Sequence, residues 1–262
     1  MSILDEILND KKNIIARDKA LMSIDQLRAL PLYGRKCLSL KEALQHSGSG
    51  IIAEFKRKSP SKGLIHPDAS AKGVGSAYEL AGASGISVLT DENFFGGSTR
   101  DLSLVRESVS LPLLRKDFII DEYQLYQSKA LGADLILLIA AALTPAETRS
   151  LAAKARQLGL EVLLEIHSLK ELDHMNEYVD ILGVNNRNLQ NFETDLRLSF
   201  RVAGYLPGQV TKISESGLSD PADLLALRRM GYKGFLMGEV FMKNPDPAKA
   251  LAGFIKQLSE HA

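Results

Sequence analysis

Short apolar segments alternate with helical patterns along most of this chain, and this alternation limits the fold more than any other feature. The strand-like segments cover residues 51–56, 85–90, 111–116, 134–140, 161–166, 180–185, 209–214 and 234–238. The clearest helical patterns lie between or after them, at 69–83, 122–131, 144–158, 169–177, 194–204, 221–230 and 247–259. Continuous apolar strands separated by helices predict a parallel sheet covered by helices. Eight strands close a barrel, so we predict an α/β fold of the (β/α)8 TIM-barrel type.

The competing fold is an open, doubly wound sheet. Such a sheet more often uses fewer strands, and a dinucleotide-binding version carries a GxGxxG motif after its first strand. Here the first strand is followed by SPSKG at residues 59–63, which is no such motif. The length of 262 residues also suits a barrel, for which about 250 residues are typical.

The amino-terminal segment precedes the alternating pattern. Apolar residues recur at helical spacing at Ile3, Leu4, Ile7 and Leu8. Lys11 belongs to the charged residues of the opposite face, and a second helical piece ends before Pro31. Residues 1–45 are either a solubilising extension or a cap on the barrel of residues 46–262. We expect the cap, because the apolar stripe needs a surface to pack against.

The composition excludes several classes of protein. Lys plus Arg and Asp plus Glu both total 32, so the formal net charge is zero and no nucleic-acid partner is expected. No segment reaches the roughly 20 apolar residues of a membrane span. The amino terminus lacks the apolar core of a secretory signal, and the single cysteine, Cys37, permits no internal disulfide. We therefore expect a cytoplasmic protein that does not bind membranes.

Polar residues gather where the predicted strands end. They occur at six of the eight strands, and the main ones are Glu54, Lys56, Lys116, Glu165, Asn185, Arg187, Glu215 and Glu239. In a (β/α)8 barrel the carboxyl ends of all strands meet at one mouth, which is where the chemistry takes place. A single charged strand end is more often solvated or paired. Polar groups on most strands favour a shared site.

Small residues follow the seventh and eighth strands, at Ser216-Gly217 and Gly238-Glu239. Barrels frequently bind phosphate with these two loops, because backbone N–H groups suit an anion. Ordinary turn glycines are the alternative interpretation. The occurrence of the pattern in both loops favours phosphate.

Other chemistries have weaker support. The histidines show no HExxH or Cys–His spacing, so no metal is expected, although His167 and Glu165 share a strand face and leave a metal pair open. No GxSxG elbow is present, and Cys37 has no motif around it. Schiff-base chemistry by a lysine remains open in principle.

Several long and distinctive motifs span almost all of the chain. They are AEFKRKSPSKG (53–63), YELAGASGISVLTDENFFGGS (78–98), LPLLRKDFIIDEYQ (111–124), GADLILLIAA (132–141), LLEIH (163–167), GVNNRNL (183–189), SESG (214–217) and MGEVFM (237–242). In these motifs the chain resembles one known family, the indole-3-glycerol-phosphate synthases of tryptophan biosynthesis, in their monofunctional form. The resemblance implies that 1-(2-carboxyphenylamino)-1-deoxyribulose 5-phosphate is converted to indole-3-glycerol phosphate, carbon dioxide and water.

The resemblance also implies a role for each matching residue. Lys116 is the general acid on the ketose carbonyl, and Glu165 is the acid–base partner for dehydration. Lys56 lies near the substrate carboxylate and phosphate and competes with Lys116 for the acid role. Glu54 and Asn185 orient the lysines and the substrate hydroxyls. The substrate-binding residues are Ser59, Arg187, Glu215, Ser216, Gly217, Gly238 and Glu239.

Further expectations concern partners and cofactors. The only partner expected for catalysis is the phosphorylated small molecule, and no cofactor is needed because the aromatic amine supplies the electrons. Its arene needs an apolar slot, and the candidates, which could equally be ordinary core, are Leu64, Phe94, Phe118, Leu138, Leu189 and the amino-terminal cap. The family implies a monomer that can associate with other tryptophan-pathway enzymes. Glu239 departs from relatives with a small hydroxyl residue there, so only its backbone N–H is expected to face phosphate. A phosphate-binding barrel isomerase and a non-catalytic binder of a phosphorylated ligand remain the alternatives.

Overall fold

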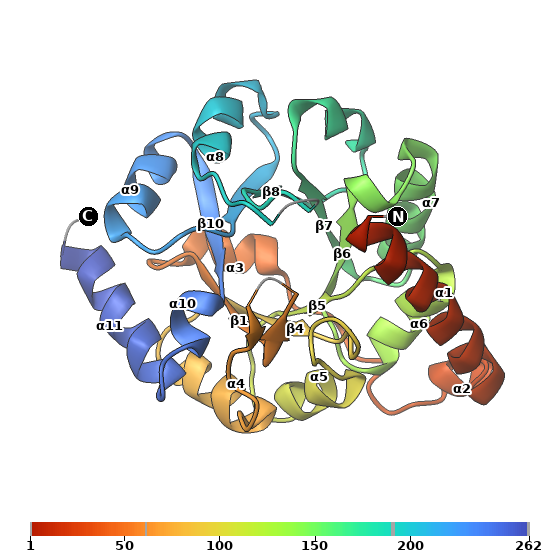
Figure 1. Ribbon diagram of the computed structural model, residues 1–262. Helices are drawn as coiled ribbons and strands as arrows, with labels where there is room; N and C mark the ends of the chain where they lie inside the picture. The colour runs from red at the N-terminus through yellow and green to blue at the C-terminus, as the bar shows by residue number, and fades with distance from the viewer. Residues whose placement is uncertain (1, 61, 190–191, 261–262) are drawn as a thin grey trace.

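A computed structural model describes residues 2–60, 62–189 and 192–260, and in this part of the chain eight parallel strands close into a barrel (Figure 1). The neighbours run in the order β1-β10-β9-β8-β7-β6-β5-β4. The strands are β1 (Ile51–Phe55), β4 (Gly85–Leu89), β5 (Leu113–Lys116), β6 (Leu135–Ile139), β7 (Glu161–Ile166), β8 (Ile181–Asn185), β9 (Thr211–Glu215) and β10 (Tyr232–Met237). The predicted barrel is confirmed, and the open sheet is excluded.

Helices surround the barrel. They are α4 (Ala71–Leu80), α5 (Thr99–Arg106), α6 (Glu122–Ala130), α7 (Pro145–Gln157), α8 (Arg197–Val202), α9 (Pro221–Arg229), α10 (Glu239–Met242) and α11 (Pro247–Glu260). Short 3-10 turns are η1 (Ala140–Ala142), η2 (Leu169–His174) and η3 (Ala203–Tyr205). The segment predicted as a helix at 169–177 is therefore only a 3-10 turn. Its Ser168 makes no side-chain cap. Helix α5 was not predicted, because it is short and largely polar.

The amino-terminal segment reaches both ends of the barrel. Helices α1 (Ile3–Leu21) and α2 (Ile24–Arg28) lie beside α6 (Figure 1). Helix α3 (Leu40–His46) lies at the opposite, amino-terminal end of the strands. Leu40 packs so close to Gly85 of β4 that a Cβ there would lie 2.6 Å from its Cδ1 atom. The expected domain boundary between residues 45 and 46 thus falls within α3.

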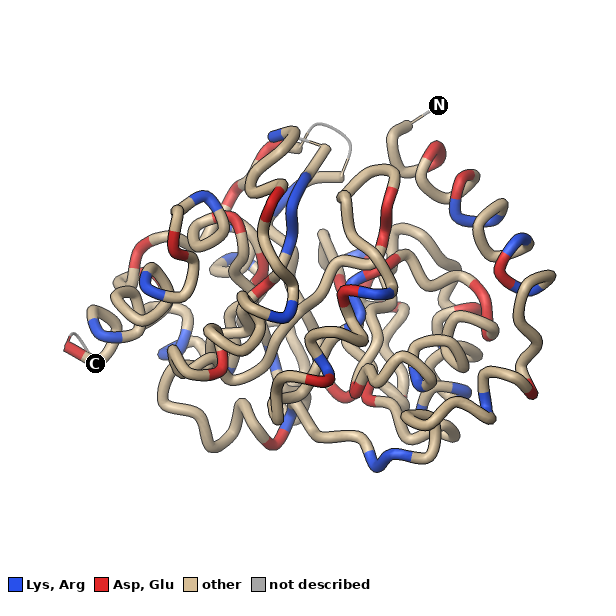
Figure 2. The backbone as a smooth tube through the Cα atoms, turned by 90° about the horizontal axis from the view of Figure 1, so that it is seen from below, with Lys and Arg blue, Asp and Glu red and all other residues tan. Residues whose placement is uncertain are grey.

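Residues of both charge signs occur throughout the described part of the chain. Figure 2 shows Lys and Arg interspersed with Asp and Glu along the backbone, including along α1. No helix in the described ranges is long and apolar enough to cross a membrane. The charged face predicted for α1 is wrong at one position, because the Lys11 side chain is only 3% exposed.

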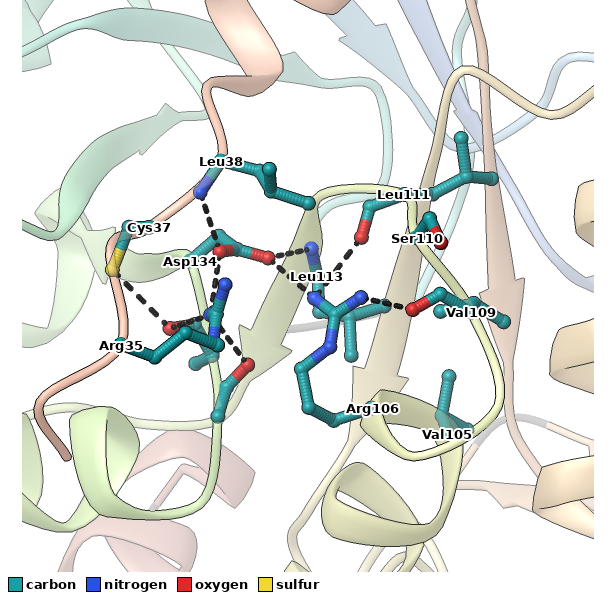
Figure 3. Close-up of polar contacts among 12 residues, drawn as sticks. Arg35, Cys37, Leu38, Val105, Arg106, Val109, Ser110, Leu111, Leu113 and Asp134 are labelled. Carbon is teal, nitrogen blue, oxygen red and sulfur yellow. Dashed lines mark hydrogen bonds and ion pairs between the residues drawn. The ribbon is translucent and has the colours of Figure 1, made fainter. Parts of the chain in front are cut away.

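A buried carboxylate joins the amino-terminal segment to the floor of the barrel. Asp134 is fully buried just before β6, and it accepts hydrogen bonds from Arg35 (2.6 Å) and from the backbone N–H of Leu38 (2.7 Å) (Figure 3). Its other oxygen accepts from Arg106 (2.9 Å) and from the N–H of Leu113 (2.8 Å). Four donors from three segments, the connection between α2 and α3, helix α5 and strand β5, therefore converge on one side chain.

We expect Asp134→Ala to destabilise the fold without changing the chemistry at the mouth. The substitution leaves Arg106 and Arg35 without their shared carboxylate, and breaking a buried pair in this way typically costs about 3–5 kcal/mol. Urea unfolding of the variant and the parent measures the difference. Asp173→Ala is the control, since that carboxylate is 65% exposed. An unfolding free energy equal to that of the parent would contradict the role assigned to Asp134.

Candidate active site

Strand alternation brings the charged residues into the barrel interior. Leu114 of β5 and Leu163 of β7 pack inside the barrel, so the residues two positions later, Lys116 and Glu165, face the same way at the carboxyl end. By the same spacing, Glu215 of β9 faces the barrel interior, above Ile213. Register pairs Asn185 with Glu215. These four polar side chains lie in the top layer of the interior, above apolar residues such as Leu114, Leu163 and Ile213.

Lys116 lies at the centre of this layer. Its Nζ atom is 2.8 Å from Glu165 Oε2 and 2.8 Å from Glu215 Oε2, and both carboxylates are almost completely buried. The Oε1 atom of Glu215 is buried and has no hydrogen-bond partner among the described residues. Gly183 makes room for it, since a Cβ there would lie less than 2.5 Å from this oxygen. One acceptor therefore remains available beside the lysine.

The pKa values of Lys116, Glu215 and Glu165 are shifted in different directions. Burial opposes the charge on Lys116, but Glu165, Glu215 and Glu54 outweigh it and hold the pKa of the ammonium above its usual range. Burial together with the nearby Glu165 carboxylate raises the pKa of Glu215 to about 7, despite the opposing attraction of Lys116. For Glu165, the attraction of Lys116 and His167 overcomes burial and lowers the pKa well below its usual value. A cation thus lies between an ionised acid and one that titrates near neutrality.

His167 supports Glu165 from behind. Its Nε2 atom lies 3.3 Å from Glu165 Oε1, and its Nδ1 atom lies 3.7 Å from Glu171 Oε2. Burial alone would lower the histidine pKa, but the two carboxylates raise it to about 9. Glu171 also accepts a hydrogen bond from the backbone N–H of His167. Around neutral pH His167 is therefore cationic.

A second ion pair lies across the mouth from this layer. Lys56 Nζ is 2.5 Å from Glu54 Oε1, which agrees with their predicted placement on one face of the first strand. Attraction by Lys56 and Lys116 outweighs burial and lowers the Glu54 pKa. Gly238 packs directly against this carboxylate, and a Cβ there would lie 2.5 Å from Glu54 Oε1.

The two predicted phosphate loops are neighbours, because they follow the paired strands β9 and β10. Ser216 and Gly217 both have positive φ, at 65° and 74°. Asn186 holds this backbone by donating to the carbonyl oxygens of Glu215 (2.9 Å) and Ser216 (3.0 Å). Ser216 is a non-glycine residue in the left-handed region, which indicates a constrained turn.

Two cationic side chains, those of Arg187 and Lys62, lie close to the Glu239 carboxylate. Its Oε2 atom lies 3.3 Å from Arg187 Nη2, and its Oε1 atom lies 4.0 Å from Lys62 Nζ. Asn185 in turn accepts a hydrogen bond from the backbone N–H of Arg187 at 3.0 Å. The two cations neutralise the Glu239 side chain, which would otherwise repel a phosphate at the loops.

One cavity of about 640 Å³ joins these parts. Every residue predicted for catalysis or substrate binding lines it: Glu54, Lys56, Ser59, Lys116, Glu165, Asn185, Arg187, Glu215, Ser216, Gly217, Gly238 and Glu239. Ser59 ends β2 (Lys58–Ser59), which forms a small hairpin with β3 (Gly63–Leu64), while Ser61 of the SPSKG loop lies outside the described residues. The roles of these residues stay predictions, but their common location is observed.

The apolar side of the cavity differs in part from expectation. Phe118 and Leu189 line it as predicted, but Phe94 is not among the lining residues, Leu138 faces the helices and Leu64 is largely exposed. The apolar lining residues missed by sequence include Phe95, Leu137 and Ile139. In β6 the inward face is identified by the strand register with β7, which pairs Ile139 with Glu165.

The described residues contain no group of three His, Cys, Asp or Glu side chains arranged to hold a metal ion. His167 does approach Glu165, but it forms an ion pair there. Cys37 accepts a contact from Lys129 Nζ at 3.0 Å on the floor side, near Asp134, and does not line the cavity at the mouth. The arrangement suits proton transfer between charged side chains.

We predict that Gly238→Ala disrupts the site. The added methyl group would displace Glu54 and, through it, Lys56, and small misplacements of this kind can cost about 10²-fold in rate. Steady-state kinetics should therefore show kcat/KM lowered by about this factor. Gly253→Ala is the matched control, because no atom lies within 4 Å of the added Cβ. Equal kcat/KM values for the two variants would refute the close fit between Gly238 and Glu54.

The barrel and its charged mouth define a (β/α)8-barrel enzyme with an acid–base site. A family model described as Indole-3-glycerol phosphate synthase matches residues 4–254. Proteins named indole-3-glycerol phosphate synthase are 51% identical in Bacteroides thetaiotaomicron, with 98% of each chain covered, and 43% identical in Salinibacter ruber, with 96% of this chain and 94% of that one covered. The chain belongs to the indole-3-glycerol phosphate synthase family.

The fold also occurs in more distant proteins. A thiamine phosphate pyrophosphorylase from Pyrococcus furiosus matches with a TM-score of 0.60 at 15% sequence identity, covering 85% of this chain and 98% of that one. At this identity the match supports the barrel fold alone. The family assignment rests on the sequence relatives.

Proposed function

We propose that this chain closes the indole ring of tryptophan biosynthesis. It converts 1-(2-carboxyphenylamino)-1-deoxy-D-ribulose 5-phosphate to indole-3-glycerol phosphate, carbon dioxide and water. The observation that carries the proposal is the position of Lys116 between Glu165 and Glu215 inside the common cavity, in a chain of this family. The isomerase and the non-catalytic binder have no comparable support.

The two ends of the substrate are anionic, and the cavity offers a counterpart for each. The phosphate binds at the backbone N–H groups of Ser216, Gly217, Gly238 and Glu239. The carboxylate lies near Lys56 and Ser59, and the arene packs against Phe118 and neighbouring apolar side chains. Fixing both ends bends a flexible chain, so that remote binding energy orders the reacting atoms.

Lys116 supplies the proton for ring closure. The ammonium donates to the ketose oxygen, the ring carbon that bears the carboxylate attacks the carbonyl carbon, and the carbon–carbon bond forms. Loss of carbon dioxide returns the electron pair to the ring and restores its aromaticity. A positioned acid contributes about 10²–10⁴-fold to such a step. The high pKa of Lys116 keeps it protonated at neutral pH.

Dehydration completes the reaction. The hydroxyl formed from the ketose oxygen leaves as water, driven by the nitrogen electron pair, and a ring proton is lost to give indole. Glu165 is the acid–base group for this step, because it contacts Lys116 directly and can exchange protons through it. The free oxygen of Glu215 is an acceptor for a substrate hydroxyl.

The remaining proposals concern organisation. Helix α1 caps the mouth, where Ile7 packs with Phe118 and Leu189, whereas α2 packs against α6 and α3 belongs structurally with the barrel floor. The enzyme works in the cytoplasm as a monomer that can associate with other enzymes of the pathway. Light scattering of the purified chain tests the monomer directly, since a dimer would double the mass of 28.7 kDa.

A fluorescence assay tests the activity. The purified protein is mixed with the carboxyphenylamino-deoxyribulose phosphate, and indole fluorescence is followed together with release of carbon dioxide. We expect equal amounts of the two products, and a much weaker reaction with the analogue that lacks the phosphate. A folded protein that yields neither product would overturn the proposed function.

A further inference from the structure

Lys11 is a buried cation in the middle of α1. Its Nζ atom lies 2.8 Å from Asp91 Oδ2 and 2.8 Å from Asp117 Oδ1, and the three side chains are at most 3% exposed. Asp91 follows β4 and Asp117 follows β5, so one side chain of the amino-terminal segment contacts the carboxyl ends of two barrel strands.

These groups belong to a neutral cluster of four charges, formed by Lys11, Asp91, Arg115 and Asp117. Asp117 also accepts from Arg115 at 2.9 Å and from the hydroxyl of Thr90 at 2.6 Å. The cluster contains two cations and two anions, and α1 supplies one of the cations. Without Lys11, two buried carboxylates would share the single charge of Arg115.

The cluster lies directly behind the reactive layer. Asp117 follows Lys116 in the chain, and it accepts a hydrogen bond from the backbone N–H of Phe118 at 2.8 Å. Asp91 accepts from the N–H of Phe94 at 2.9 Å, and both aspartates line the cavity. The backbone on either side of Asp117 carries Lys116 and Phe118, so the cluster controls where both side chains point.

A simple anchoring role does not explain a buried lysine. Helix α1 already buries Ile7 and Ile15, and Lys19 at its exposed end contacts Asp121 at 2.7 Å. Burying an ion pair often stabilises a protein no better than apolar residues of similar volume. The placement of Lys11 therefore calls for a role beyond holding the helix.

We propose that Lys11 is a positioning residue of the active site, supplied by the amino-terminal helix. It neutralises Asp91 and Asp117 and fixes the loops after β4 and β5, so that Lys116 and Phe118 keep their working orientation. The helix is then a part of the catalytic unit. This inference rests on the proposed function.

The test compares Lys11→Met with Lys19→Met, which removes an exposed cation from the same helix. We expect Lys11→Met to lower kcat by about 10²-fold, the scale of a small misplacement at the reacting atoms, and Lys19→Met to leave kcat unchanged. Both are assayed below the melting temperature of the less stable variant. The double variant Lys11→Met/Asp91→Asn restores the neutrality of the cluster. We expect its kcat to be at least tenfold higher than that of Lys11→Met.

Each outcome has a defined meaning. An unchanged kcat in Lys11→Met, with or without a lower melting temperature, would show a purely structural role and overturn the inference. A reduced kcat that the double variant does not recover would overturn the charge-balance argument. The parent protein is measured in the same assay, so its failure to turn over substrate would overturn the proposed function, and this inference with it.

Discussion

Lys116→Ala is expected to lower kcat by about 10²–10⁴-fold while KM changes little. The substitution removes the ammonium that polarises and protonates the ketose oxygen, but it leaves the loops around Ser216 and Gly238 intact. The fold should survive, because the proton that Glu215 can hold near neutral pH relieves the repulsion between the two remaining carboxylates. Indole fluorescence under steady-state conditions measures both constants.

Lys56→Ala provides the comparison that separates the two lysines. Lys56 is paired with Glu54 and lies near the proposed carboxylate site, so its removal should raise KM more than it lowers kcat. Near-normal turnover by Lys116→Ala, combined with a severe kcat loss in Lys56→Ala, would transfer the acid role to Lys56. Lys19→Ala controls for the loss of a lysine at an exposed ion pair.

Glu165→Gln is expected to lower the rate of indole formation by about 10²–10⁴-fold, because the amide cannot exchange the proton needed for dehydration. Ring closure and decarboxylation depend on Lys116, so carbon dioxide should still be released. A single-turnover experiment that follows both products should therefore show carbon dioxide well before indole. The amide preserves the size of the side chain beside Lys116 and His167.

Glu161→Gln is the matched control for this variant. Glu161 begins the same strand at the floor of the barrel, where it accepts hydrogen bonds from the backbone of Leu40 and Lys41. Its replacement should reduce stability and leave the product order unchanged. Simultaneous release of carbon dioxide and indole by Glu165→Gln at a normal rate would refute the dehydration role.

The barrel could be predicted because its signal is repeated along the chain. Strand ends such as Lys116 and Glu215 are visible in sequence because charged residues interrupt apolar runs. Parallel strands are buried on both faces, so periodicity does not reveal which apolar residues face inward. This is why Leu138 was chosen although its neighbours Leu137 and Ile139 line the cavity.

The amino-terminal segment was the least predictable part. A lysine on a helix is usually solvated, so Lys11 was grouped with the charged face. Its position four residues after Ile7 and four before Ile15 places it on the apolar stripe, and this spacing separates it from Lys12. The partners that bury Lys11 are Asp91 and Asp117, which are remote in sequence. Helix α3 was missed because it is short. Its apolar residues Leu40 and Leu44 are buried only because they pack against the barrel floor, a contact that the sequence does not show.

The central claim is that Lys116 acts on the ketose carbonyl while the loops after β9 and β10 hold the phosphate. A crystal structure with the reduced substrate, in which a hydroxyl replaces the ketose carbonyl, tests it most directly. We predict Lys116 Nζ within about 2.6–3.2 Å of that hydroxyl and the phosphate at the N–H groups of Gly217 and Gly238. A phosphate bound elsewhere, or a hydroxyl held by Lys56 and remote from Lys116, would contradict the account.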